Sequence, residues 1–319
     1  VTKWIADHHQ WNVNSEWMRF IPGIVKGIGF VINVFCKPDE KVIIQPPVYH
    51  PFRLTPLGNK RQVVMNPLIM NEDGSYSMDF DGLAKVADDK CRVLILANPH
   101  NPAGIVWNVD TLSRLADFCS ERGIIVISDE IHCDMAHKGH KHHPFASVSD
   151  RAAQCSITFG APSKTFNIAG IVSSYCVVPN EELRRPFFEW LDANELSEPT
   201  IFSPIATIAA FKYGEEWRRQ MLEYVEANID FVDNFLQTRI PQIKALRPQA
   251  SFLVWLNCRA LNLDHDALNR LFVDGARLAL NDGEMFGREG RGFMRMNIAS
   301  PRAVLQDALE RLEKAVKAL

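Results

Sequence analysis

The stretch that decides the fold is CRVLILANPHNPAGIVWNVDTLSRLADFCSERGIIVISDE, residues 91–130. Its two ends, 91–98 and 123–130, are almost continuously apolar, which is typical of parallel strands buried on both faces of a sheet. The segment between them has apolar side chains at the helical spacing i, i+3, i+4 and i+7, namely Leu112, Leu115, Ala116 and Cys119. Either Asn108 or Asp110 can cap the start of this helix. A strand, a helix and a second buried strand predict a βαβ unit.

Apolar runs of the same kind recur on both sides of this unit, at 42–44, 155–159 and 171–179. Helical patterns separate the runs, so that strands and helices alternate from about residue 23 to residue 180. Because a parallel strand pair needs a crossover segment, this alternation predicts an open α/β sheet whose strands are mostly parallel.

The C-terminal part of the chain has a different pattern. Charged helical segments extend to about residue 240, and the remaining strands and helices are expected at 251–258, 264–274, 292–299 and 301–318. Strands and helices without strict alternation favour an α+β arrangement. We therefore predict two domains: a large α/β domain with an interdomain helix over residues 1–240, and a small α+β domain over residues 241–319.

The composition is typical of a soluble globular protein of about two domains, with 319 residues of which 47% are apolar and 23% charged. The net charge of -3 argues against a nucleic-acid partner. No apolar run approaches the roughly 18 residues that cross a bilayer, so we predict no membrane partner. The seven cysteines form no CxxC pair and lie partly in apolar runs. This usage favours free thiols buried in a reducing compartment, and hence a cytoplasmic location.

Polar residues follow four of the expected strands at their carboxyl ends, where ligands of open α/β sheets bind. The four segments are QPPVYHPF (45–52), NPHNPAG (98–104), SDEIH (128–132) and GAPSKTFN (160–167). Read singly, Asp129 fits a magnesium ligand or a helix cap, and Lys164 fits a solvated loop lysine. Together the segments offer an amine, a carboxylate, an amide and an aromatic ring. Pyridoxal phosphate needs such a set, because it forms a Schiff base with a lysine and pairs its ring nitrogen with an acid.

Longer motifs carry a resemblance to a known family. The order NPHNPAG, SDEIH, PSKTFN resembles the fold-type I pyridoxal phosphate enzymes of the aminotransferase superfamily. Four segments resemble its cystathionine β-lyase, or C–S lyase, branch: SDEIHCD (128–134), APSKTFNIAG (161–170), ALNDGEMFG (279–287) and GFMRMNIASPR (292–302). The resemblance implies the aspartate aminotransferase type of fold, pyridoxal 5'-phosphate as cofactor, a small amino-acid substrate and a homodimer with active sites at the subunit interface.

The resemblance also implies roles for individual residues around the cofactor ring and the substrate. Lys164 is expected to form the Schiff base and afterwards to remove the substrate Cα proton. Asp129 is expected to keep the pyridine nitrogen protonated, and Asn101 to hydrogen-bond the 3-oxygen of the ring and to lie beside the substrate. Tyr49 would stack on the ring and assist proton transfer. Arg295 would bind the substrate α-carboxylate through two parallel hydrogen bonds, a geometry that lysine does not reproduce.

The phosphate of the cofactor is expected at the start of the helix predicted for PGIVKGIGFVINVF (22–35). Free N–H groups at a helix N-terminus attract anions, and the family binds phosphate there through the backbone, here at Ile24 and Val25. Ser163 adds a hydroxyl group. His132 stands three residues after the acid, where many aminotransferases carry a tyrosine that faces the 3-oxygen, so we include it among the cofactor-binding residues.

Two features depart from the family pattern. Many relatives place a phosphate-binding Arg or Lys eight residues after the lysine, where this sequence has Val172. Either the site is less cationic here, or Lys26 and a partner chain supply the charge. Relatives also carry roughly 70 residues before the segment that matches HHQWNVNSEWMRFIPG (8–23). Those residues build part of the small domain and supply a tyrosine to the neighbouring subunit's phosphate site. We therefore expect either a truncated form or gene model, or a chain that lacks a piece of the usual active site. Folding and cofactor binding are expected to survive, but not full activity.

The histidine-rich segment HCDMAHKGHKHHPF (132–145) holds one cysteine and four histidines besides His132. A metal site is one interpretation, but the sequence has no CxxC or HExxH motif and no evident partner ligands elsewhere. We interpret the segment as a solvated loop over the active-site mouth and predict no metal.

Three functions stay open from the sequence. The first is β-elimination from cystathionine, cysteine or related S-substituted cysteines, which releases pyruvate, ammonia and a thiol. The second is transamination of aromatic or neutral amino acids with a 2-keto acid. The third, of a different class, is a pyridoxal phosphate-binding protein that acts as a scaffold or regulator without catalysis.

Overall fold

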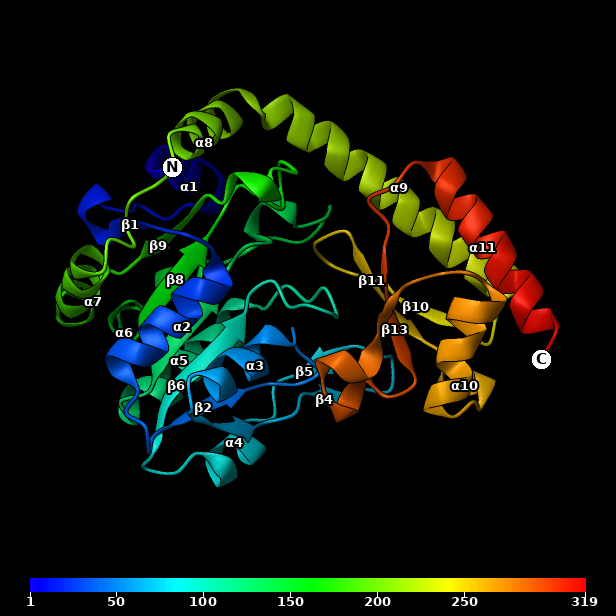
Figure 1. Ribbon diagram of the computed structural model, residues 1–319, viewed down its shortest axis with the longest axis horizontal. Coiled ribbons are helices and arrows are strands. Elements are labelled where there is room, and N and C mark those ends of the chain that lie inside the picture. Colours follow the sequence, from blue (N-terminus) through cyan, green and yellow to red (C-terminus); the bar gives the residue numbers. More distant parts are fainter.

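The computed structural model describes residues 1–319 and contains a seven-stranded and a four-stranded sheet, with helices around both (Figure 1). The strand order of the large sheet is β1-β9-β8-β7-β6-β2-β3. Its strands are β1 (Met18–Ile21), β2 (Lys41–Ile44), β3 (Gln62–Met65), β6 (Cys91–Ala97), β7 (Ile125–Asp129), β8 (Ser156–Gly160) and β9 (Ser174–Val177). The neighbours from β3 to β8 pair in parallel, so the predicted mostly parallel α/β sheet is confirmed.

Helices cover both faces of this sheet, and successive strand residues point to opposite faces. Val93 and Ile95 of β6 pack on one face with α2 (Ile24–Phe35), α3 (Pro51–Gly58) and α7 (Glu181–Ala193). Leu94 and Leu96 pack on the other face with α4 (Phe80–Val86), α5 (Val109–Glu121) and α6 (Asp150–Gln154). Burial on both faces explains why these strands are almost continuously apolar.

The βαβ unit β6–α5–β7 has the form that the sequence predicts. The four apolar side chains of α5 that follow the helical spacing are all buried: Leu112, Leu115, Ala116 and Cys119. Asn108 is the N-cap, because its side chain accepts a hydrogen bond of 2.8 Å from the backbone N–H of Thr111. Asp110, the alternative cap, lies in the first turn instead.

The direction of β9 differs from the prediction. The run 171–179 was expected as a parallel strand, but β9 pairs antiparallel with both β8 and β1. Between β8 and β9 the chain forms only a short 3-10 turn, Ala169–Ile171, in place of a crossover helix, and a parallel pair needs such a crossover. Because β1 is antiparallel to β9, it runs in the same direction as β8, and its carboxyl end lies at the same edge of the sheet.

The second sheet is antiparallel, with the order β10-β11-β13-β12. Its elements are β10 (Lys244–Leu246), β11 (Leu253–Asn257), β12 (Asn281–Asp282), β13 (Phe293–Asn297) and the helices α10 (His265–Arg270) and α11 (Arg302–Lys317). A short hairpin of β4 (Ile69–Met70) and β5 (Tyr76–Ser77) completes the strands. The strands and helices expected after residue 240 are thus present, while the domain boundary at that residue stays a prediction.

A long helix, α9 (Glu215–Arg239), connects the two parts of the chain. Figure 1 shows α9 running from α8 (Phe202–Tyr213), near the N-terminal helix α1 (Thr2–His9), to the second sheet and α11. Side chains of α9 share a buried core with both of the C-terminal helices. All seven cysteines are free, buried thiols, as predicted. None of the helices combines the length and the apolar character that crossing a membrane requires.

Candidate active site

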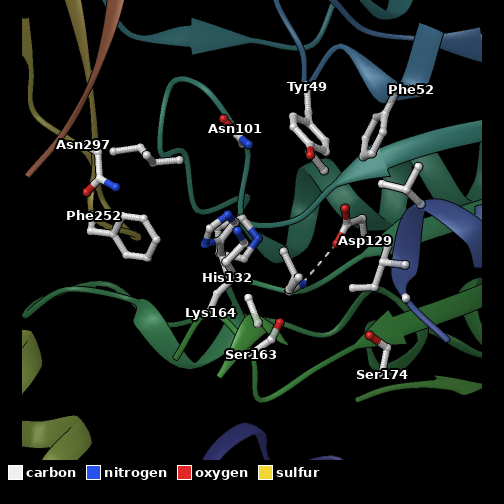
Figure 2. A pocket seen from close by; sticks show the side chains of 18 of the residues that line it. Tyr49, Phe52, Asn101, Asp129, His132, Ser163, Lys164, Ser174, Phe252 and Asn297 are labelled. Carbon is white, nitrogen blue, oxygen red and sulfur yellow. Dashed lines mark hydrogen bonds between the residues drawn. The ribbon is translucent and has the colours of Figure 1, made fainter. Parts of the chain in front are cut away.

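A cavity of about 380 Å³ lies where the carboxyl ends of β1, β2, β6, β7 and β8 face the second sheet. Its volume is in the range of pockets that bind small molecules and cofactors. All the site residues predicted from the sequence line it: Ile24, Val25, Tyr49, Asn101, Asp129, His132, Ser163, Lys164 and Arg295. Figure 2 shows Tyr49, Asn101, Asp129, His132 and Lys164 around the same space, although they come from four separate segments of the chain.

The parallel strands bring these segments together because each strand ends at the same edge of the sheet. Backbone hydrogen bonds then connect the loops that follow neighbouring strands. The N–H of Tyr49, after β2, donates to the carbonyl of Asn101, after β6, at 3.1 Å. The N–H of Asn98 donates to the carbonyl of Asp129 at 2.9 Å. The loops are therefore held in register with the sheet, which gives their side chains defined positions.

Asp129 is the last residue of β7 and is buried, with 8% of its surface exposed. One carboxylate oxygen accepts a hydrogen bond of 3.1 Å from the N–H of Ile131, and the other accepts none from the protein. Burial raises the pKa of Asp129 from its ordinary value of 3.8 to about 7. A carboxyl group in this state is ready to pair with a cationic partner in the cavity.

Lys164 lies four residues after the end of β8, and its side chain is exposed to the cavity. The side-chain amine makes no hydrogen bond or ion pair within the protein. Its positive charge opposes the rise in the pKa of Asp129, but more weakly than burial raises it. The cavity therefore holds a free amine within electrostatic reach of a carboxyl group that lacks a full partner.

Arg295 reaches the cavity from β13, in the second sheet. Its guanidinium donates hydrogen bonds of 2.7 Å to the side-chain oxygens of Asn101 and Asn281, and lies 4.7 Å from the ring centroid of Phe286. Both hydrogen-bond acceptors are neutral amides, so no protein carboxylate compensates the positive charge. Burial lowers the pKa of Arg295 to about 10. An incoming carboxylate is the natural partner of such a group.

His132 is buried beside the cavity, with its Nδ1 atom lacking any hydrogen-bond partner. Burial, reinforced by the positive charges of Lys164 and Arg295, lowers the pKa of His132 to about 3. The imidazole is therefore neutral at physiological pH. It also lies edge-on to Phe252, with 6.0 Å between the ring centroids. A neutral imidazole can donate or accept one hydrogen bond without adding a third positive charge to the cavity.

The N-terminus of α2 lies at one end of the cavity. Gly23 caps the helix with φ of 119°, and the following residues Ile24 and Val25 line the cavity. N–H groups of a first helical turn have no partner within the helix and suit an anion. Val172 also lines the cavity, in a left-handed backbone conformation with φ of 54°. Lys26 does not line it.

Several lining residues were not predicted from the sequence. They are Phe52, Ser173, Ser174, Phe252, Asn281 and Asn297. Asn281 contacts Arg295 because the two residues are register partners on β12 and β13. Sequence spacing carries no signal for this register, since β12 has only two residues. The serines near β9 follow the lysine segment closely and could have been found by considering the whole loop.

The histidine-rich segment 132–145 is not the solvated loop that the sequence suggested. Cys133, Asp134, His137 and His142 are buried, and only residues 138–141 form an exposed tip. Of the segment, only His132 lines the active-site cavity. The prediction was wrong because the sequence of these polar residues does not reveal that they have buried partners. One such partner is Glu130, whose carboxylate oxygen lies 2.9 Å from Nε2 of His142.

A mostly parallel α/β sheet whose strand edge presents a free lysine and a buried aspartate in one cavity is typical of a class of protein: enzymes with the aminotransferase type of fold. Comparison with known families agrees. The family model described as "Aminotransferase class I and II" matches residues 1–312, and the chain belongs to this family.

Individual relatives are similar over almost the whole chain. The "Cystathionine beta-lyase PatB" of Bacillus subtilis (strain 168) is 39% identical over 317 residues, which cover 99% of this chain and 82% of the relative. Cystalysin from Treponema denticola, whose crystal structure contains pyridoxal 5'-phosphate, has a TM-score of 0.96 at 34% identity. That match covers 99% of this chain and 80% of cystalysin. A pyridoxal phosphate-bound C–S lyase from Staphylococcus hominis has a TM-score of 0.91 at 31% identity, covering 99% and 82%. The predicted fold class is confirmed.

Proposed function

We propose that this chain is a pyridoxal phosphate-dependent carbon–sulfur β-lyase. Its reaction is β-elimination from cystathionine, cysteine or a related S-substituted cysteine, with release of pyruvate, ammonia and a thiol. The observation that carries the proposal is the position of Lys164 and Asp129 in one cavity, with Arg295 facing the same space. The lyase names of the relatives at 39% and 31% identity support this reaction over others of the family.

The groups of the cavity fit pyridoxal phosphate. The buried carboxyl of Asp129 lacks a cationic partner, and a protonated pyridine nitrogen is one. The free amine of Lys164 suits a covalent bond to the aldehyde. The first turn of α2, with the hydroxyl of Ser163, suits the phosphate. When bound, the cofactor withdraws electrons from the substrate Cα atom and so makes its proton removable.

The protein groups then bind the substrate and move its protons. Arg295 binds the α-carboxylate, because its charge has no acidic partner in the protein. The amine of Lys164 accepts the proton from Cα. Asn101 accepts a hydrogen bond from Arg295 through its oxygen, which leaves its N–H groups for the 3-oxygen of the ring. His132 is a neutral second partner for that oxygen, and Tyr49 offers an aromatic face for the ring and a phenol for proton transfer.

The alternative within the family is amino transfer to a 2-keto acid. The two reactions begin with removal of the same proton from Cα. In β-elimination the Cβ–S bond then breaks and the thiolate leaves, whereas in amino transfer that bond stays intact and Lys164 delivers the proton to another atom. To separate them, the purified holoenzyme is incubated with L-cystathionine, and pyruvate is measured through lactate dehydrogenase. Pyruvate formation without any added keto acid, absent in the Lys164→Ala variant, is the expected result. Amino transfer that requires an added keto acid, without pyruvate from cystathionine alone, would instead establish an aminotransferase.

We also infer that the chain forms a homodimer. The surface of α8 and the residue before it expose a row of large apolar side chains, between 61% and 73% accessible: Ile201, Phe202, Ile205 and Ile208. Apolar residues clustered in this way mark surfaces that are covered in an assembly. Helix α8 lies close to α1, on the side of the large sheet (Figure 1). A second copy of the chain is the expected occupant of its exposed apolar row.

A further inference from the structure

A second cluster of chemically versatile side chains lies outside the active-site cavity. His9, the last residue of α1, meets Cys133 and Asp134 in the short 3-10 turn after β7. Its Nε2 atom is 2.8 Å from a carboxylate oxygen of Asp134, and the ligating atoms of all three residues lie within 4.8 Å of one another. The side chains of His9 and Asp134 are only 8% and 3% exposed, and Cys133 is a buried free thiol.

The structure assigns a zinc-binding site to His9, Cys133 and Asp134. Imidazole nitrogen, thiolate sulfur and carboxylate oxygen are the usual protein ligands of Zn²⁺, at about 2.0–2.3 Å from the ion. A tetrahedral arrangement at these bond lengths separates the ligand atoms by roughly 3.3–3.8 Å. The cluster therefore needs a contraction of about 1 Å at its widest point, within the reach of side-chain rotation. None of the three residues lines the active-site cavity, so this site is separate from the one proposed above.

Hydrogen bonds from neighbouring residues orient the carboxylate ligand. The indole N–H of Trp4 donates to the side chain of Asp134 at 2.8 Å, and a guanidinium N–H of Arg218 donates to its backbone carbonyl at 2.9 Å. Contacts of this kind fix the direction of ligands and strengthen metal binding. The charge of Arg218 does not oppose a cation strongly, because Glu215 pairs with it at 2.9 Å.

A pocket of about 120 Å³ borders the cluster and gives an ion a path from solvent. His140 and His142 line this pocket together with the three ligands. The ring of His142 lies edge-on to that of His9, with 5.2 Å between centroids, and its Nδ1 atom is buried without a hydrogen-bond partner. Water or one of these two histidines can occupy the fourth zinc position. Bound zinc would connect α1 to the 3-10 turn that follows β7, the strand that ends at Asp129.

The test uses the full chain loaded with pyridoxal phosphate, stripped of metal by a chelator and then equilibrated with zinc sulfate. We expect about one zinc per chain by elemental analysis after gel filtration, and a thermal midpoint that rises with zinc. X-ray absorption spectroscopy should show one sulfur neighbour at about 2.3 Å with lighter neighbours near 2.0 Å. The visible spectrum of the cofactor should stay unchanged, which separates this site from the active site.

Three variants and a matched control show which residues bind zinc. Cys133→Ser, His9→Ala and Asp134→Asn should each weaken zinc binding at least ten-fold and remove the zinc-dependent thermal shift. His143→Ala is the control, because this histidine is in the same segment and its side chain makes no hydrogen bond; it should bind zinc like the wild type. Zinc binding that is equal in the wild type and all three variants overturns the assignment. A wild-type absorption spectrum without a sulfur neighbour overturns it too, whether or not the variants fold.

Discussion

The side chain of Asp129 titrates close to neutral pH, because burial raises its pKa to about 7. A raised carboxyl pKa means that the folded, cofactor-free protein binds a proton that the unfolded chain has already released. Its stability therefore falls as the pH rises from about 4 to about 7, and the loss is complete above that window. A shift of about three pKa units corresponds to roughly 4 kcal/mol. In the holoenzyme a cationic ring nitrogen would remove this penalty.

Asp129→Asn tests this directly, because asparagine keeps the shape and has no charge. Without cofactor, the wild type should lose stability between pH 4.5 and pH 8, whereas the variant should not lose it. The free energy of unfolding of the variant, relative to that of the wild type, should therefore rise by on the order of 3–4 kcal/mol over this range. Urea denaturation at several pH values measures the difference. The holoenzyme should respond in the opposite sense, with weaker cofactor binding in the variant. If the difference in unfolding free energy between wild type and variant does not change with pH, the carboxyl group of Asp129 does not have a raised pKa.

Lys164 has no protein partner, so its replacement should leave the rest of the cavity intact. We expect Lys164→Ala to lose the covalent bond to the cofactor and to slow proton removal from the substrate by at least 10²–10⁴-fold. The absorption spectrum and the retention of cofactor through gel filtration report the first effect. Pyruvate release from cystathionine reports the second. A variant that keeps both the wild-type spectrum and tightly held cofactor would show that another amine binds it.

Asn281 should position Arg295 without neutralising it. Asn281→Ala removes one of the two hydrogen bonds to the guanidinium and should raise KM for the amino acid several-fold, with a smaller effect on kcat. Asn281→Asp keeps the shape but adds a negative charge that competes with the substrate carboxylate, so its KM should exceed that of the alanine variant. If the aspartate variant instead resembles the wild type, shape alone matters at this position, and the uncompensated charge of Arg295 has no role.

The sequence led to some site residues and missed others for a physical reason. Lys164, Asp129 and Asn101 stand out because each is a polar residue at, or within four residues of, the carboxyl end of an apolar strand, where the fold brings ligands. Asn281 and His9 carry no such signal. Asn281 reaches Arg295 through the register of β12 and β13, and His9 reaches Asp134 across 125 positions of the chain. Long-range contacts of this kind depend on packing rather than on local pattern.

Elements buried on both faces were predictable, and edge elements were not. The strands β6, β7 and β8 appear in the sequence as continuous apolar runs, since helices cover both of their faces. The edge strand β3 was missed, because its side chains are only partly buried and its apolar pattern is weak. The antiparallel direction of β9 was also missed. Direction depends on the connection between strands, and the segment before β9 contains the active-site lysine rather than a helix.

The start of α2 depends on a glycine, which makes the end of the cavity where we propose that the phosphate binds sensitive to one substitution. Gly23 has φ of 119° and ψ of 144°, a conformation essentially restricted to glycine, although a Cβ atom there would meet no neighbour. Gly23→Ala should therefore cost on the order of 1–3 kcal/mol through backbone strain and weaken cofactor binding. Fluorescence titration of the apoprotein with pyridoxal phosphate measures this.

Gly58→Ala is the matched control for that substitution. Position 58 also has open space for a Cβ atom, but its backbone is not in the left-handed region. Cofactor affinity should be unchanged in this variant. Equal affinities in both variants and the wild type would show that the helix start does not bind the phosphate.

At the scale of the whole molecule, the two sheets contribute different parts of one site. The large sheet positions the residues that we propose for the cofactor, and the second sheet carries Arg295 and Asn281, which we propose for the substrate carboxylate. The core of the second sheet is shared with α9, and Phe286 and Phe293 also pack into a core of the large sheet. The distance between cofactor and carboxylate groups is thus set by packing between the sheets rather than by a single loop.

The exposed apolar row on α8 leads to a test of the proposed homodimer. A double variant, Ile205→Lys with Ile208→Lys, places two positive charges in this row. It should disrupt a dimer, because each lysine would have to be desolvated in the interface. Analytical ultracentrifugation should show the wild type near twice the chain mass of 36.2 kDa and the variant near the single mass. Val304→Lys is the control, since Val304 is an apolar residue 55% exposed on α11, at the other end of the molecule (Figure 1). A dimer that persists in the α8 variant, or one lost in the control, would place the interface elsewhere.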